Sequence, residues 1–315
     1  MQAYILRRLL LIVPTMLIVS LIVFLSMRLI PGDVLDYMVS LRYMSAGAME
    51  ALREQLGLNL PAHVQYARWI SGVFQGDFGD TLLTNLAVEE VIIERLPRSL
   101  ELGALSLVFA LVIALPVGIY SGLKPESAGD QVLRSVAIAF ICIPSFWLGT
   151  MILVLPAVWW RWSPPMYWVS FWDNPLGNLA MFIIPAIVLG MWLSGVTMRL
   201  TRTMMLEVMR QDYIRTAWAK GLRERAVVLR HALRNALNPV LTTIGLQLPV
   251  LIGGAVVVEH IFNIPGIGSL VVRTLEQRDY PLLAGLNMMM AGFVLLVNVI
   301  VDISYAWLDP RIQYK

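Results

Sequence analysis

Long apolar runs alternate with shorter polar stretches along almost the whole chain. A helix needs about 20 mostly apolar residues to cross the hydrocarbon core of a bilayer, and six runs come close to that length. We expect membrane spans at residues 9–30, 102–123, 135–159, 179–196, 239–258 and 282–307. The pattern therefore predicts an all-α polytopic membrane protein with six transmembrane helices.

Three of these runs carry features that modify the picture of straight spans. Pro144 and Pro156 are expected to break the third run, because proline removes a helix hydrogen bond. The fourth run is expected to continue as a helix past Val196. Gly118 and Gly122 end the second run at a spacing that lets two membrane helices approach closely.

The composition fits a membrane protein better than a soluble domain. Hydrophobic residues make up 58% of the 315 residues and charged residues only 14%, whereas soluble domains are about half apolar and a quarter charged. A net charge of +3 is too small to indicate a nucleic-acid partner. The single cysteine, Cys142, excludes an internal disulfide, and we expect it to be a small buried apolar residue.

The chain begins with Arg7 and Arg8 ahead of an apolar run, as a signal peptide does. That run is longer than a signal core, and no small-residue cleavage site follows it, so we interpret it as an uncleaved first span. The lipid bilayer is therefore an expected partner.

The distribution of lysine and arginine predicts the orientation of the spans. With the N-terminus inside, the inner segments hold 15 basic residues, and nine of these lie between Arg199 and Arg234. The short outer loops hold only Arg161, Arg273 and Arg278. Both termini are therefore expected to be cytoplasmic.

This topology divides the chain into three predicted segments. Residues 1–30 form the N-terminal tail and first transmembrane helix, and residues 31–101 form an extracytoplasmic segment. Residues 102–315 form a five-helix core that includes a cytoplasmic loop at 199–238.

The segment from 212 to 239 is the most basic part of the chain. Tyr213, Ile214, Ala217 and Trp218 recur at helical spacing, and Gly221 suits the end of a short helix, where a positive φ is often needed. A second helical run is expected from about residue 223 to 237, with Pro239 beginning the next element. A helix as short as the first is marginal alone in water, so it must pack on neighbouring helices or on a second protein.

This loop resembles a pattern found in one family of transporters. The pattern reads EAA, three residues and Gly, and its matching positions here are Arg215, Thr216, Ala217 and Gly221, followed by Leu233 and Arg234. The leading Glu and the final Pro of the pattern are absent. The stretches at 95–106, 262–271, 278–281 and 309–312 match as well. The chain thus resembles the membrane permease subunits of the dipeptide, oligopeptide and nickel group of bacterial ABC importers.

The resemblance implies the type I importer permease fold, a location in the bacterial inner membrane and a set of partners. These are a second homologous permease, two ATPase subunits that hydrolyse ATP, and an extracytoplasmic solute-binding protein that delivers peptides or similar small solutes. The implied ATPase-docking residues are Asp212, Tyr213, Arg215, Thr216, Ala217, Trp218, Lys220, Gly221 and Arg223. Orientation alone also explains a basic inner loop, and a basic amphipathic helix can instead lie on anionic lipid.

The segment from 31 to 101 has two readings. Gly76, Asp77 and Gly79 are turn signals, and residues 49–58 predict a short amphipathic helix with Met49, Leu52 and Leu56 on one side. The segment could be a structural cap over the first helix pair. The resemblance implies that it is part of the surface that receives the solute-binding protein.

Motifs for catalysis and for nucleotide binding are missing from the sequence. No lysine follows a glycine, so there is no P-loop, and neither Gly-x-Ser-x-Gly nor His-Glu-x-x-His occurs. His63, His231 and His260 are far apart. We therefore expect no enzyme activity, no metal site and no cofactor in this chain.

The centres of the second to fifth runs hold no charged residue, although intramembrane charge usually marks ion coupling. Gln247, Glu259, His260 and Asn287 are candidate pathway or gate residues, with helix–helix hydrogen bonding as the simpler explanation for Gln247 and Asn287. An ion-gradient-driven secondary transporter is the alternative function, and it should show carboxylates at mid-membrane depth and inverted repeats.

Overall fold

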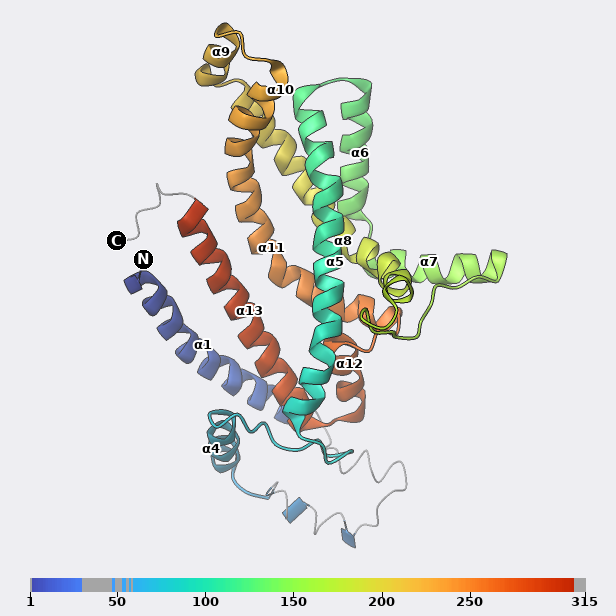
Figure 1. The fold of residues 1–315 in the computed structure, drawn as a ribbon. Coiled ribbons are helices and arrows are strands. Elements are labelled where there is room, and N and C mark those ends of the chain that lie inside the picture. The colour runs from blue at the N-terminus through green and yellow to red at the C-terminus, as the bar shows by residue number, and fades with distance from the viewer. Residues whose placement is uncertain (1, 30–46, 49–52, 55–56, 58, 309–315) are drawn as a thin grey trace. The chain divides into compact units, whose positions relative to one another are not determined.

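The structure is a computed structural model that describes residues 2–29, 47–48, 53–54, 57 and 59–308 (Figure 1). The described residues form helices and turns, and their only extended pairing is an isolated bridge between Asp80 and Ala87. The predicted all-α class is confirmed. The predicted helix at 49–58, with Met49, Leu52 and Leu56, lies outside the described residues.

The chain folds into two compact units. The first unit comprises Met1–Arg98 and Pro265–Val299, and the second comprises Ser99–Ile264 and Ile300–Lys315. This division follows internal contacts, whereas the segments 1–30, 31–101 and 102–315 were defined by membrane topology. The topological division therefore stays a prediction.

Among the described residues, five helical stretches are long and apolar enough to cross a membrane, and a bent pair of helices raises the number to six. The five are Leu6–Leu29 within α1 (Gln2–Leu29), α5 (Val88–Leu123), α8 (Pro175–Met209), the continuous stretch Glu224–Ile261, and Tyr280–Ile303 within α13 (Tyr280–Leu308). Five of the six predicted runs each fall on one of these stretches, and the run at 135–159 falls on the bent pair. As expected, α8 continues as a helix well past Val196.

The bent pair replaces the third predicted span. Helices α6 (Ala128–Cys142) and α7 (Ser145–Trp160) meet at an angle of 94°. Proline disfavours the helical conformation of the residue before it, and Ile143 is accordingly extended, with ψ of 118°. The second expected break is wrong, since Pro156 lies inside α7. Backbone groups in a strongly apolar segment have few partners outside the helix, which favours keeping it intact.

In the first unit, α1 packs on α4 (Ala62–Val73), and α5 packs with α12 (Ile267–Gln277) and α13. The Ser20 and Tyr66 hydroxyls lie 2.8 Å apart, and the Phe24 ring lies edge-on to Tyr66. The α5–α12–α13 core contains Val88, Ile92, Ile267, Leu270, Leu282 and Leu286. The turn predicted at 76–79 is present, and the amide of Gly79 donates to the Asp77 carboxylate at 2.8 Å.

In the second unit, α8 is the central helix and packs closely against α5. A Cβ atom placed on Gly118 would lie 2.5 Å from the Cβ of Thr201 and 2.9 Å from the carbonyl oxygen of Met198. A Cβ atom on Gly122 would lie 2.5 Å from the Cβ of Met205. The close approach predicted from these two glycines is confirmed.

Two other expectations were wrong. Pro239 does not begin an element, because α10 (Glu224–Ala226), the π-helix η1 (Val227–Ala232) and α11 (Leu233–Ile261) are consecutive and Pro239 lies inside α11. A proline costs a helix one hydrogen bond, and α11 continues on both sides of Pro239 despite this loss. Cys142 is exposed at the end of α6 instead of buried.

Candidate functional site

The basic segment folds back on its own chain at one end of the second unit (Figure 1). Its first helix, α9 (Asp212–Ala219), has Ile214 fully buried and Ala217 only 6% exposed. These two residues belong to a cluster that also contains Met205, Val227, Val228, Ala232 and Ala236. A helix of eight residues is unstable alone, and this cluster gives it a surface to pack on.

Gly221 ends the α9 turn as the sequence predicts. Its φ is +74°, and the amides of Gly221 and Leu222 donate to the carbonyls of Trp218 and Ala217. No atom lies within 4 Å of a Cβ placed on Gly221. The glycine is therefore required by the backbone conformation and not by a close neighbour within this chain.

We call residues 212–232, which contain all nine predicted docking residues, the docking segment. The π-helix η1 is its last part and leads into α11. The amide of Leu233 donates to the carbonyl of Val228, five residues earlier, which adds one residue to that turn. Val227, Val228 and Ala232 are buried against α9 and its surroundings. Side chains also link the two elements, because the Asn235 amide donates to the Tyr213 hydroxyl at 2.9 Å.

Eight of the nine predicted docking residues are exposed, namely Asp212, Tyr213, Arg215, Thr216, Trp218, Lys220, Gly221 and Arg223. Ala217 is the exception, since it is 6% exposed and packs inside its own chain. Apolar side chains remain exposed beside it: Tyr213, Trp218, Leu222 and Leu229. We call these four residues the exposed apolar set of the docking segment.

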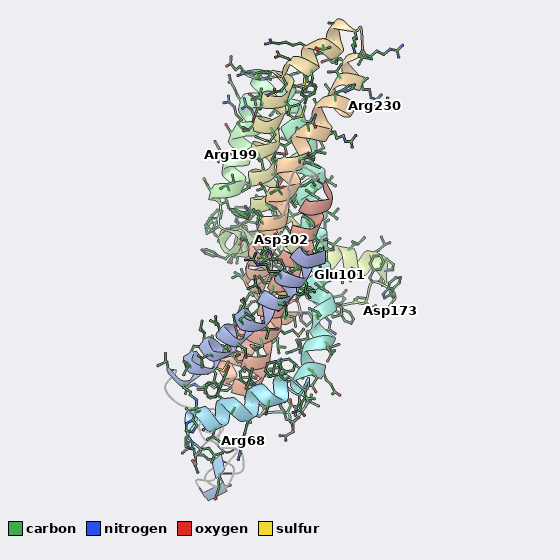
Figure 2. All side chains as sticks on the ribbon, turned by 90° about the vertical axis from the view of Figure 1, so that its left-hand side faces the viewer. Arg68, Glu101, Asp173, Arg199, Arg230 and Asp302 are labelled. Atoms are coloured by element: carbon green, nitrogen blue, oxygen red, sulfur yellow. The ribbon has the colours of Figure 1, made fainter. Side chains whose placement is uncertain are left out.

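Basic residues of the second unit gather toward one of its ends. Figure 2 shows Arg199 and Arg230 toward the end that carries the docking segment, and Glu101 and Asp173 toward the other end. Basic residues thus accumulate where α9 lies, in line with the count of lysine and arginine along the sequence.

A buried ion pair near the docking segment was not anticipated from the sequence. Arg202 of α8 donates from Nε and Nη2 to the two carboxylate oxygens of Asp130, at 2.7 and 2.8 Å. Asp130 is fully buried and also accepts from the amide of Glu126 at 3.0 Å. Ser127 caps α6 by accepting from the amide of Asp130. Serine three residues before an acid could have indicated this helix start, but its partner is 72 residues away.

The first unit holds a second buried aspartate. Asp279 is 2% exposed and accepts hydrogen bonds from the amides of Leu82, at 3.0 Å, and Leu282, at 3.3 Å. It therefore joins the loop before α5 to the first turn of α13. Burial raises the pKa of the Asp279 carboxyl, and the hydrogen bonds from the backbone amides partly oppose that rise.

The four candidate gate residues have different surroundings. On α11, Glu259 is fully buried, His260 is exposed, and Gln247 is half-buried. On α13, the Asn287 amide donates to the carbonyl of Leu283 in its own helix. The first three belong to the second unit and Asn287 belongs to the first. Their role as a gate stays a prediction.

Similarity to known proteins shows the family to which this chain belongs. Residues 114–314 match the family described as "Binding-protein-dependent transport system inner membrane component", and residues 1–103 match its N-terminal counterpart, "Binding-prot-dependent transport system membrane comp, N-term". The chain belongs to this family of transport permeases. It is therefore an inner-membrane component of a binding-protein-dependent transport system, as the resemblance implied.

Particular relatives align along their entire length. The chain is 40% identical over 318 residues to the oligopeptide transport system permease protein AppB of Bacillus subtilis, with all of both chains covered. It is 39% identical over 338 residues to the dipeptide transport system permease protein DppB of Escherichia coli K12, again with full coverage. A putative peptide transport system permease protein of Brucella abortus is 40% identical over 315 residues, with full coverage.

Solved structures support the fold. The inward-facing MetNI methionine ABC transporter matches with a TM-score of 0.56 at 16% identity, covering 70% of this chain and 97% of that one. The crystal structure of an amino acid ABC transporter with histidines matches with a TM-score of 0.53 at 11% identity, covering 71% of this chain and 95% of that one. The ABC importer permease fold predicted from the sequence is confirmed.

Proposed function

We propose that this chain forms half of the translocation pathway of an ATP-driven importer for peptides or similar small solutes. The observation that carries the proposal is the full-length match to permeases named for dipeptide and oligopeptide transport. The same match favours an importer over an ion-gradient-driven secondary transporter.

The proposed assembly contains a second homologous permease, two ATPase subunits and an extracytoplasmic solute-binding protein. The family description itself refers to a binding protein. The chain has no P-loop, so ATP hydrolysis is assigned to the ATPase subunits. This assembly predicts uptake by reconstituted vesicles that requires the partner subunits and ATP, and that survives collapse of the ion gradients. Solute accumulation by this chain alone on a proton or sodium gradient would overturn the proposal.

The proposed orientation places both termini and the loop at 199–238 in the cytoplasm, with residues 31–101 outside. The excess of lysine and arginine near the docking segment supports it. Single cysteines at Gly47, Lys124, Ser170 and Arg223, in a Cys142→Ala background, should report the side of each position. Positions 47 and 170 should react with an impermeant reagent in intact cells, whereas positions 124 and 223 should react only after the membrane is opened.

The docking segment is proposed to bind a cleft of the ATPase through its exposed apolar set, with the predicted polar docking residues around it. Exposed apolar side chains gathered on one segment are typical of a protein-binding surface. ATP binding can bias two permease states only if the ATPase contacts this segment differently in each. The segment is therefore the proposed point at which the ATPase cycle acts on alternating access.

The variant Trp218→Ala tests this contact, because Trp218 is 43% exposed and contributes little to the buried cluster. It should lower co-purification of the ATPase at least tenfold and leave the melting temperature of the permease unchanged. Arg215→Ala is the control on the same helix, since the Arg215 side chain is 72% exposed and pairs with Asp212, and its effect should be smaller. Equal ATPase recovery for Trp218→Ala and wild type would contradict docking through this face.

Ala217→Asp, in contrast, should disturb the permease itself. Ala217 is buried in the cluster under α9, so a charge there is unpaired in an apolar environment. We expect α9 to detach and ATPase association to fall as a consequence. Proteolysis within residues 212–222 should therefore rise for Ala217→Asp and stay at the wild-type level for Trp218→Ala.

A further inference from the structure

We propose that Asp130 and Arg202 are positioning residues that make α6 and the C-terminal part of α8 move together when α9 is displaced. The inference rests on the proposed function, in which the ATPase acts on α9. Through this pair, a displacement of the docking segment would reach α6 and, beyond the bend, α7.

The geometry of the pair is that of a rigid link. Both guanidinium–carboxylate contacts are short, and their two-point arrangement fixes the orientation of the two groups as well as their distance. The carboxylate is fully buried, and the Arg202 side chain is 19% exposed. Water competes poorly for such a pair, and removing one partner leaves a buried charge without compensation.

The pair lies where three helices meet. Asp130 is in the first turn of α6, its carboxylate accepts from the amide of Glu126 in the turn after α5, and Arg202 is on α8. The buried hydroxyl of Ser121, on α5, lies beside the same carboxylate. One carboxylate thus ties the end of α5 and the start of α6 to α8.

The same part of α8 carries the docking segment. Met205, three residues after Arg202, is fully buried in the cluster that holds Ile214 and Ala217 of α9. A Cβ atom on Gly122 of α5 would lie 3.2 Å from the carbonyl oxygen of Arg202. The packing leaves little space between α5, α8 and α9, so motion of α9 is expected to carry α8 with it.

Apolar packing alone would hold α6 differently. A Cβ atom on Gly195 would lie 2.7 Å from the carbonyl oxygen of Ala137, so α6 and α8 also touch there. Gly195 is seven residues before Arg202, which is about two helical turns. Ala137 also packs with Met198 of α8. The ion pair adds a polar fixed point nearer to α9, beyond the reach of this apolar packing.

The test uses the reconstituted importer with both permeases, both ATPases and the binding protein. The variants are Asp130→Asn, Arg202→Lys and Arg202→Gln. Two quantities are measured: the stimulation of ATP hydrolysis by the binding protein, and the uptake of a mixture of radiolabelled di- and tripeptides per ATP hydrolysed. We expect normal ATPase association, with uptake per ATP at least tenfold lower for Arg202→Gln and Asp130→Asn, and an intermediate loss for Arg202→Lys, which keeps the charge but not the two-point contact.

Arg134→Gln is the matched control. Arg134 approaches the same carboxylate at 3.6 Å, but its side chain is 46% exposed and belongs to α6 itself, so it cannot tie α6 to α8. Its uptake per ATP should equal that of wild type. The double variant Asp130→Arg with Arg202→Asp should recover part of the lost coupling, although arginine near a helix N-terminus is disfavoured.

Wild-type uptake per ATP in Arg202→Gln and Asp130→Asn would overturn the inference. Parallel loss of ATPase association and of uptake in these variants would also overturn it, because the pair would then only maintain the fold. Failure of the proposed function is distinguishable from both, since the wild-type assembly itself would then show no ATP-dependent uptake.

Discussion

Two aspartates, Asp130 and Asp279, are buried in the part of the chain that the structure describes, and they are stabilised in different ways. In the second unit, Asp130 is bound by the guanidinium of Arg202, and in the first unit Asp279 is bound by the backbone amides of Leu82 and Leu282. Both lie at the start of a helix, where negative charge is favourable. Asp130 thus has an opposite charge at short range, whereas Asp279 accepts hydrogen bonds from neutral groups.

The difference shows what each carboxylate can do. A guanidinium belongs to a side chain of another helix, so the Asp130 pair connects two long helices. Backbone amides belong to the segments that they shape, so Asp279 holds the loop at 77–87 against the start of α13. The first arrangement suits the transmission of movement between helices, and the second suits a fixed connection between a loop and a helix start.

The largest effect should come from Arg202→Gln. Loss of the guanidinium leaves a fully buried carboxylate with the amide of Glu126, the hydroxyl of Ser121 and the more distant Arg134. Breaking a buried pair from one side costs about 3 kcal/mol or more. Asp130→Asn should cost less, because the Arg202 side chain keeps some access to solvent. Thermal unfolding of the purified permease measures both, and equal losses would mean that the two sides of the pair are equivalent.

A smaller effect is expected at Asp279. Asp279→Leu leaves the amides of Leu82 and Leu282 buried without acceptors, at about 1–3 kcal/mol for each unsatisfied group. Asp279→Asn keeps one acceptor oxygen and should lose less than half as much. Hydrogen exchange of the Leu82 and Leu282 amides reports the change directly. If both amides stay as protected in Asp279→Leu as in wild type, the carboxylate does not hold this turn.

The smallest effect is a dependence on pH in the first unit. Because burial raises the pKa of the Asp279 carboxyl, the folded chain binds this proton more tightly than the unfolded chain does. Its contribution to stability is therefore complete below the ordinary aspartate pKa of about 3.9 and is lost as the pH rises through the raised value. Protection of the Leu82 amide should fall slightly over that range in wild type. Asp279→Asn should show no such dependence, and an opposite slope in wild type would contradict the role of burial.

Features that depend on short stretches of sequence were predictable. The positions of the apolar runs follow from hydrophobicity, because a bilayer requires about 20 apolar residues for each span. The short helix α9 and the positive φ of Gly221 follow from helical spacing and from the glycine at its end. The close approach at Gly118 and Gly122 follows from the size of the residue.

Features that depend on residues far apart in the sequence could not be predicted. The inward direction of Ala217 depends on Val227 and Val228, which are contributed by a π-helix that no residue pattern indicated. The 94° angle at Pro144 is set by packing on both sides of the break, although the break itself was foreseen. The partner of Asp130 is 72 residues away, and nothing in either local sequence distinguishes Arg202 from the other basic residues of the loop.

The π-helical turn between α10 and α11 also determines the direction in which the docking segment faces around the helix axis. In an α-helix each residue advances by about 100°, so one extra residue in a turn rotates everything on one side of it by that angle relative to the other side. Deleting a single residue within Val227–Ala232 would restore α-helical spacing and swing α9 around the axis of α11. A one-residue change in length at this place would thus redirect the exposed face of α9 without altering any residue of α9.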